Sequence, residues 1–101
     1  MSKQEKSVFP DKDIHVYADD MTEDMSKLAI QTSQDAFQLF ITQGKVFSTI
    51  AAYIRTAFDK ALGKGWNCIV GKNFGAFVTH EIKTYIYFTI VPGTYILLWK
   101  A

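Results

Sequence analysis

A cysteine, a histidine and an asparagine are the side chains in this sequence whose types could support nucleophilic catalysis. Cys68, His80 and Asn73 match a thiol protease, in which an imidazole activates a cysteine and an amide orients the imidazole. Such a triad is defined by its geometry in the fold, and none of the short signatures that surround a catalytic cysteine is present. Cys68 shares a predicted strand face with Trp66 and Val70, which favours a small buried hydrophobic residue. A thiol enzyme that uses Cys68 and His80 is kept only as an alternative.

The residues give little support for metal or phosphate chemistry. The two histidines, His15 and His80, are too few and too far apart in the chain for a metal site, and a single cysteine excludes a Cys-rich zinc site. The segment Lys72–Gly75 lacks the glycine spacing and the following helix of a phosphate-binding loop. A turn explains this segment better. We expect no metal, no cofactor and no catalytic residue.

Composition limits the class of protein further. The chain has 101 residues, of which 49% are hydrophobic and 15% aromatic, and this suits one small globular domain. A net charge of +1 argues against a nucleic-acid binder driven by overall basicity. We expect no secretory leader and no membrane-spanning run, and one cysteine cannot form an internal disulfide. We expect a protein of the reducing cytosol that binds neither nucleic acid nor membrane.

Two amphipathic helices are predicted in the first two-thirds of the chain. Thr22 is a suitable N-cap with acidic residues in the turn that follows, and apolar residues then recur at helical spacing. Residues 42–47 connect this helix to the next, and their conformation stays open. Ser48 or Thr49 is expected to cap the second helix, which Gly63 ends.

Several segments have the alternating or β-branched pattern of strands. They are residues 14–17, 66–70, 76–79, 85–90 and 94–100. Residues 1–13 are mostly polar and are expected to form a flexible tail, which places the domain at 14–101. The predicted fold class is α+β, with two helices packed on one face of a small antiparallel sheet.

The predicted strands carry more large apolar side chains than two helices can cover. The set comprises Phe74, Phe77, Tyr85, Ile86, Tyr87, Phe88 and Trp99. The surplus must be buried by another chain or left as a recognition surface. Tyr85 and Tyr87 share a strand face, and because a tyrosine hydroxyl prefers a polar partner, they suit a half-open groove better than a sealed core.

Several stretches of the sequence resemble the small cytoplasmic dynein light chains of the eight-kilodalton class. They are Gly-Lys-Asn-Phe-Gly at 71–75, Val-Thr-His-Glu at 78–81, the aromatic run at 85–88, residues 18–25 and 50–60, and the ending at 96–100. The resemblance implies a strand-exchanged homodimer, in which a segment matching Phe74–Thr79 crosses to the partner's sheet. An extended peptide is then expected to add to the free edge of that segment as one more antiparallel strand.

The resemblance also implies site residues. Those expected to bind peptide are Lys72, Asn73, Phe74, Gly75, Ala76, Phe77, Thr79, His80, Tyr85 and Tyr87. Those expected at the dimer interface are Asn67, Phe74, Phe77, Val78 and Thr79.

The implied function is that of a non-enzymatic hub, a dimer that binds short linear motifs and holds two such chains side by side. The resemblance implies a light chain of the microtubule motor dynein, located in the cytoplasm and cytoskeleton, with the dynein intermediate chain among its partners. A divergent paralogue that keeps the dimer but serves a non-dynein assembly is the main alternative.

At several positions the sequence departs from this family. Tyr17 and Ala18 stand where Lys-Asn is usual, Phe77 replaces a groove tyrosine, and Thr89 stands where another tyrosine is common. These changes predict a drier groove with fewer polar groups. Asn67 replaces an interface histidine, and because asparagine gains no proton between pH 5 and 8, the dimer is expected to persist in mild acid.

Overall fold

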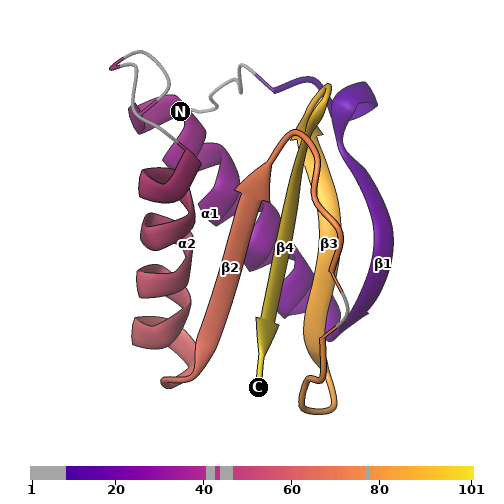
Figure 1. Ribbon diagram of the computed structural model, residues 1–101, viewed down its shortest axis with the longest axis vertical. Helices are drawn as coiled ribbons and strands as arrows, with labels where there is room; N and C mark the ends of the chain where they lie inside the picture. Colours follow the sequence, from indigo (N-terminus) through magenta and orange to yellow (C-terminus); the bar gives the residue numbers. More distant parts are fainter. Residues whose placement is uncertain (1–8, 41–42, 44–46, 77) are drawn as a thin grey trace.

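A computed structural model describes residues 9–40, 43, 47–76 and 78–101. Two helices cover one face of a four-stranded antiparallel sheet (Figure 1), which confirms the predicted α+β class. In chain order the elements are a short 3-10 helix η1 (Asp11–Asp13), β1 (His15–Met21), α1 (Glu23–Phe40), α2 (Phe47–Leu62), β2 (Trp66–Gly71), β3 (Thr84–Val91) and β4 (Thr94–Lys100). The strand order β1-β3-β4-β2 places β1 and β2 at the two edges of the sheet. Most of the predicted connector at 42–47 lies outside the described residues.

The starts of the two helices have different causes. The hydroxyl of Thr22 accepts a hydrogen bond from the N–H of Met25 at 3.2 Å, so the predicted N-cap of α1 is confirmed. The predicted start of α2 is two or three residues too late, because the helix already includes Phe47. Phe47 packs against the hydrophobic core, so its burial stabilises an earlier first turn, and Ser48 and Thr49 lie inside that turn.

The end of α2 is joined directly to the start of β2. Gly63 has a φ of 91° and donates its N–H to the carbonyl of Asp59 at 3.1 Å, as predicted for a glycine that ends a helix. The side chain of Asp59 accepts the N–H of Trp66 at 3.1 Å. Asp59 therefore fixes the direction in which the chain leaves α2 and enters the sheet.

Two predicted strands differ from those observed. β1 continues to Met21 instead of ending near Tyr17, because Met21 is buried in the core and the end of β1 pairs with β3. The predicted strand at 76–79 is not formed in the single chain, where the described part of this segment has no strand assignment. A strand needs a neighbour that completes its hydrogen bonds. In Figure 1 this segment instead crosses the sheet on the side opposite α1.

Alternate residues of the same strands face opposite sides of the sheet. The side toward the helices carries Ile86 and Phe88 from β3 and Ile96 and Leu98 from β4, all fully buried. The residues between them lie on the other side, which we call the outer face. It comprises Tyr17, Asn67, Ile69, Tyr85, Tyr87, Tyr95, Leu97 and Trp99. The predicted surplus of apolar side chains is thus divided between a sealed core and an aromatic face that no helix covers.

The predicted face of β2 is confirmed, since Trp66 and Val70 belong to the buried core and Cys68 packs against it. At the other end of the chain, Phe9 packs edge-on against Phe37 of α1, with ring centroids 6.5 Å apart. Residues 1–8 lie outside the described residues, and the flexible tail stays a prediction. Within the described ranges, no helix is long and apolar enough to span a bilayer.

Candidate functional site

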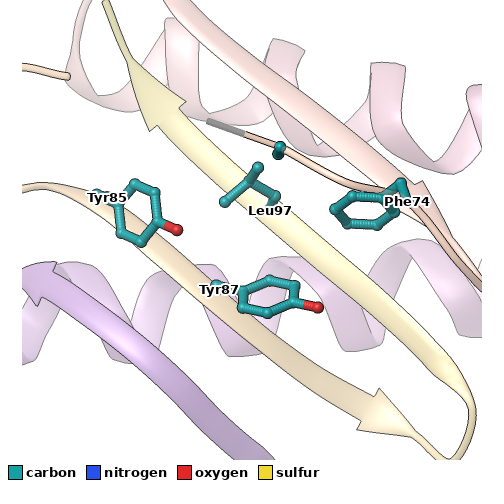
Figure 2. Close-up of a pocket in the computed structure, with 5 residues that line it drawn as sticks. Phe74, Tyr85, Tyr87 and Leu97 are labelled. Atoms are coloured by element: carbon teal, nitrogen blue, oxygen red, sulfur yellow. The ribbon is translucent and has the colours of Figure 1, made fainter. Parts of the chain in front are cut away.

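A cavity of about 200 Å³ lies on the outer face, between the sheet and the segment that joins β2 to β3. Its lining residues are Phe74, Ala76, Tyr85, Tyr87 and Leu97. Figure 2 shows the rings of Tyr85 and Tyr87 from β3, with Leu97 from β4 and Phe74 from the crossing segment, gathered around the same space. The rings of Phe74 and Tyr87 meet edge to face at 6.1 Å. An extended segment can therefore lie across this part of the sheet and make apolar contacts with it.

Three tyrosines extend the outer face from the cavity toward β1. The ring centroids of Tyr17, Tyr87 and Tyr95 are 5.6, 5.9 and 6.1 Å apart in the three pairings. We call these three residues the tyrosine cluster. Burial, with a smaller effect of the neighbouring tyrosines, raises the pKa of Tyr87. Tyr87 therefore keeps its proton at physiological pH, and the three packed rings form a largely apolar surface.

A β-bulge interrupts β1 beside this cluster. The pairing of β1 with β3 shifts between Val16 and Ala18, so β1 has one more residue than the strand opposite. Val16 pairs with the buried Phe88, so ordinary alternation places the Tyr17 ring on the outer face, where it contacts Tyr87. The bulge places Ala18 opposite Tyr87, so two consecutive residues of β1 lie on that face.

The end of the crossing segment is fixed to β1 through Asp20. The Asp20 carboxylate accepts the N–H of Lys83 at 3.0 Å, and the Lys83 ammonium lies 3.8 Å from it. The His80 Nδ1 lies 3.9 Å from the same carboxylate and 2.7 Å from the carbonyl oxygen of Glu81. Because a carbonyl only accepts, Nδ1 carries the proton in the neutral ring and Nε2 is the acceptor. The His80 ring also lies 4.8 Å from that of Tyr85, beside the cavity.

The outer edge of β2 has no strand beside it in the described part of the chain. An unpaired edge presents a row of N–H and C=O groups that can pair with another chain. Asn67 lies on this strand, half-buried, with its side-chain amide 3.4 Å from the carbonyl oxygen of Gly65. The site therefore combines an open strand edge, an apolar face and a crossing segment that lacks a strand partner.

Comparison with known proteins identifies the family. The family model described as dynein light chain type 1 matches residues 13–101. The chain belongs to the dynein light chain family. The cytoplasmic dynein light chain of Emericella nidulans is 44% identical over 82 residues, which span 81% of this chain and 82% of that protein. The predicted resemblance is confirmed, and the likeness supports a location in the cytoplasm and cytoskeleton and an association with motor proteins.

Solved structures share the fold of this dynein light chain. The dynein light chain-like domain of FhCaBP2, a calcium-binding protein of Fasciola hepatica, superposes with a TM-score of 0.74 at 17% identity, over 94% of this chain and 98% of that one. The DLC-like domain of CsTAL3 superposes with a TM-score of 0.62 at 20% identity, over 95% and 98% of the two chains. At these identities the likeness establishes the fold alone.

The fold of this light chain gathers part of the predicted peptide site. The predicted residues Phe74, Ala76, Tyr85 and Tyr87 line the cavity, and His80 lies beside it. Other predicted residues lie exposed on the crossing segment and do not line the cavity. They are Lys72, Asn73, Gly75 and Thr79. Phe77 lies outside the described residues, and Val78, predicted at the interface, is half-buried.

Reasoning from the sequence missed three residues of this region. Leu97 and Tyr95 lie on the outer face because β4 alternates like β3, and that alternation could have revealed them. Asp20, two residues before the predicted cap of α1, lies in β1 and anchors Lys83. No local signal marks a contact between residues so distant in the chain.

The alternative of a thiol enzyme based on Cys68 and His80 is wrong. Cys68 points toward the helices from β2, and burial raises the pKa of its thiol from 9.0 to about 12. His80 lies against Asp20 of β1 and Tyr85 of the outer face. The two side chains are near opposite edges and on opposite faces of the sheet, so the histidine cannot act as a base for the cysteine. The dynein light chain family is generally non-enzymatic.

Proposed function

We propose that this light chain is a non-enzymatic dimeric hub that binds short extended segments of other proteins by strand addition. The observation that carries the proposal is that two parts of the single chain lack a β-strand partner. The segment at 76–79 has the sequence of a strand, yet its described residues 76, 78 and 79 have no strand partner. Among the described residues, no strand lies beside the outer edge of β2. If two copies of the chain exchange this segment, each segment gains a strand partner and each edge of β2 gains a neighbouring strand.

In the proposed dimer, Phe74–Thr79 of each protomer pairs beside β2 of the other. The interface residues are then Asn67, Phe74, Phe77, Val78 and Thr79. Exchange also brings the two outer faces together, so that half-buried apolar side chains such as Ile69 and Trp99 lose contact with water. Burial of these side chains supplies a driving force that the single chain lacks.

The exchanged strand has a second edge, and we propose that the peptide adds there. Its backbone pairs with the strand, while alternate side chains reach the apolar rings of Tyr85 and Tyr87 on the outer face. The residues proposed to bind peptide are Lys72, Asn73, Phe74, Gly75, Ala76, Phe77, Thr79, His80, Tyr85 and Tyr87. Two equivalent grooves make binding bivalent, because the second strand of a paired partner docks at high effective concentration.

The dynein intermediate chain is the first partner that we propose, because the chain belongs to a dynein light chain family. A specific observation favours the alternative, in which the same dimer serves a non-dynein assembly. Thr89 is buried, and its hydroxyl donates to the turn carbonyls of Val91 and Thr94, so it offers no polar group to a ligand. With Tyr17 and Tyr95 also on this face, the groove is more apolar than the family pattern implies.

Two measurements test the proposal. Sedimentation velocity at micromolar concentration should give the mass of a dimer, and a mass near the 11.5 kDa of one chain would contradict the exchange. An array of peptides from disordered protein segments of the same organism should contain binders. The light chain should not alter any of these peptides chemically. Binders from the intermediate chain would support a dynein role, and binders only from other proteins would support the alternative assembly.

A further inference from the structure

We propose that β1 is protected against the addition of a further strand, so that copies of this chain pair through β2 alone. The inference deepens the proposed function, because it says which of two open edges takes part in assembly. Among the described residues, β1 and β2 form opposite edges of the sheet, and neither has a strand on its outer side (Figure 1). An open edge can pair with a strand of another copy. If both edges paired, assembly would continue into chains and would not stop at a dimer.

The edge of β2 has a regular and uncharged strand. Its residues Trp66–Gly71 pair with β4 at six consecutive positions without a shift in register. None of these residues carries a charged side chain. A new strand can therefore pair along the whole of this edge without meeting a bulge or a charge.

The edge of β1, in contrast, is interrupted by its bulge. Val16 pairs with Phe88 and Ala18 with Tyr87, so Tyr17 is an extra residue without a partner on β3. A bulge bends the strand and increases its twist, which breaks the even row of N–H and C=O groups on the outer side. The parts on either side of it, 15–16 and 18–21, are at or below the short end of strand lengths. Neither part offers a new strand a long regular edge.

Asp19 protects the longer of these two parts. It pairs with the buried Ile86 and so lies on the helix side of the sheet, where its carboxylate accepts the Ser26 hydroxyl of α1 at 3.4 Å. A strand that covered this charge would remove it from water, which is costly. The same carboxylate accepts the N–H of Met21 at 2.9 Å, so this backbone donor is not available to a new strand. Two β1 strands side by side would also bring their Asp19 and Asp20 carboxylates together.

The test is sedimentation velocity of the whole chain after this protection has been removed. Deletion of Ala18 lets Tyr17 pair with Tyr87 and keeps every other pairing of β1 with β3. Asp19→Val removes the charge and the acceptor for Met21. The double variant should form species heavier than the unmodified protein, with a weight-average mass that rises with concentration. Asp19→Val alone should show a smaller shift in the same direction, and circular dichroism checks that each variant is folded.

Two further variants separate pairing at the edge from aggregation of unfolded chains. Asp35→Val is the matched control, because it removes an exposed carboxylate from α1, away from both edges, and should leave the mass unchanged. Val16→Lys, added to the double variant, restores a charge on the helix side of β1 and should return the mass to that of the unmodified protein. Because the loss of an apolar side chain destabilises the fold, aggregation through unfolding would increase in this triple variant.

The outcomes distinguish this inference from the proposed function. A folded double variant with the mass of the unmodified protein would overturn the inference and leave the exchanged dimer standing. Growth that Val16→Lys does not reduce would overturn it as well. If the double variant does not fold, an unchanged mass of Asp19→Val overturns the inference and an increased mass supports it. The mass of a single chain for the unmodified protein would contradict the exchange, whereas growth of the double variant would still support the protection of β1.

Discussion

The two faces of this sheet are built from the same strands, yet they differ in how far the single chain completes them. On the side of the helices, Ile86, Phe88 and Leu98 are fully buried and carry no polar side-chain atom. On the outer face, Tyr85 and Tyr87 are only half-buried, and each has a hydroxyl that prefers water or a polar partner. The difference teaches that the single chain completes one face of the sheet by itself and leaves part of the other exposed, and we propose that a second chain covers that part.

The largest expected effect is a difference in stability between two variants, each with one side chain truncated on one face of the sheet. Phe88→Ala leaves a cavity in a closely packed core and should lower the free energy of unfolding by about 3–5 kcal/mol. Tyr87→Ala should cost clearly less, because its ring already contacts solvent on the outer face. Urea unfolding followed by far-ultraviolet circular dichroism measures both. Equal losses would mean that the outer face is as much a core as the inner one.

A smaller effect is expected from alkaline pH at the inner face. The pKa of the Cys68 thiol is raised from 9.0 to about 12 by burial, so the folded state keeps a proton that the unfolded chain releases. The contribution of Cys68 to stability is therefore complete below about pH 9 and is lost as the pH rises toward about 12. Urea unfolding at about pH 8 and about pH 10.5 should show a steeper loss in the unmodified protein than in Cys68→Ala. Identical losses would show that Cys68 is not desolvated.

At the outer face, single groove substitutions should have modest effects on binding. Thr79→Ala and His80→Ala should each weaken peptide binding by about 1 kcal/mol, as expected for the loss of one neutral hydrogen bond, and should leave the dimer intact. Isothermal titration with a peptide from the array measures the affinity, and sedimentation measures the assembly. Lys60→Ala on α2 is the control. Unchanged affinity in both groove variants would mean that the groove lies elsewhere.

The smallest expected effect concerns mild acid, which should leave the assembly of the unmodified protein unchanged. Asn67 lies on the open edge of β2 and cannot gain a charge in mild acid, so the proposed dimer should persist from pH 7 to about pH 5. Asn67→His introduces a group that can become charged there, and burial of that charge should split the dimer. Sedimentation velocity across this range compares the two proteins. Dissociation of the unmodified protein near pH 5 would contradict the role given to Asn67.

The sequence by itself determined the features that depend on near neighbours. Thr22 caps α1 and Gly63 ends α2, because capping needs only residues within one turn. Strand alternation placed Trp66 and Val70 in the core. The short stretches at 71–75 and 78–81 were enough to indicate the family that the comparisons confirm.

Only the tertiary structure decided the features that depend on segments far apart in the chain. The bulge that places Ala18 on the same face as Tyr17 depends on how β1 pairs with β3, and no residue pattern within β1 predicts it. Asp20 anchors Lys83 across 63 positions, a contact that local propensity cannot encode. The described residues of the predicted strand at 76–79 are not in a strand in the single chain, because a strand depends on the edge beside it as well as on its own residues.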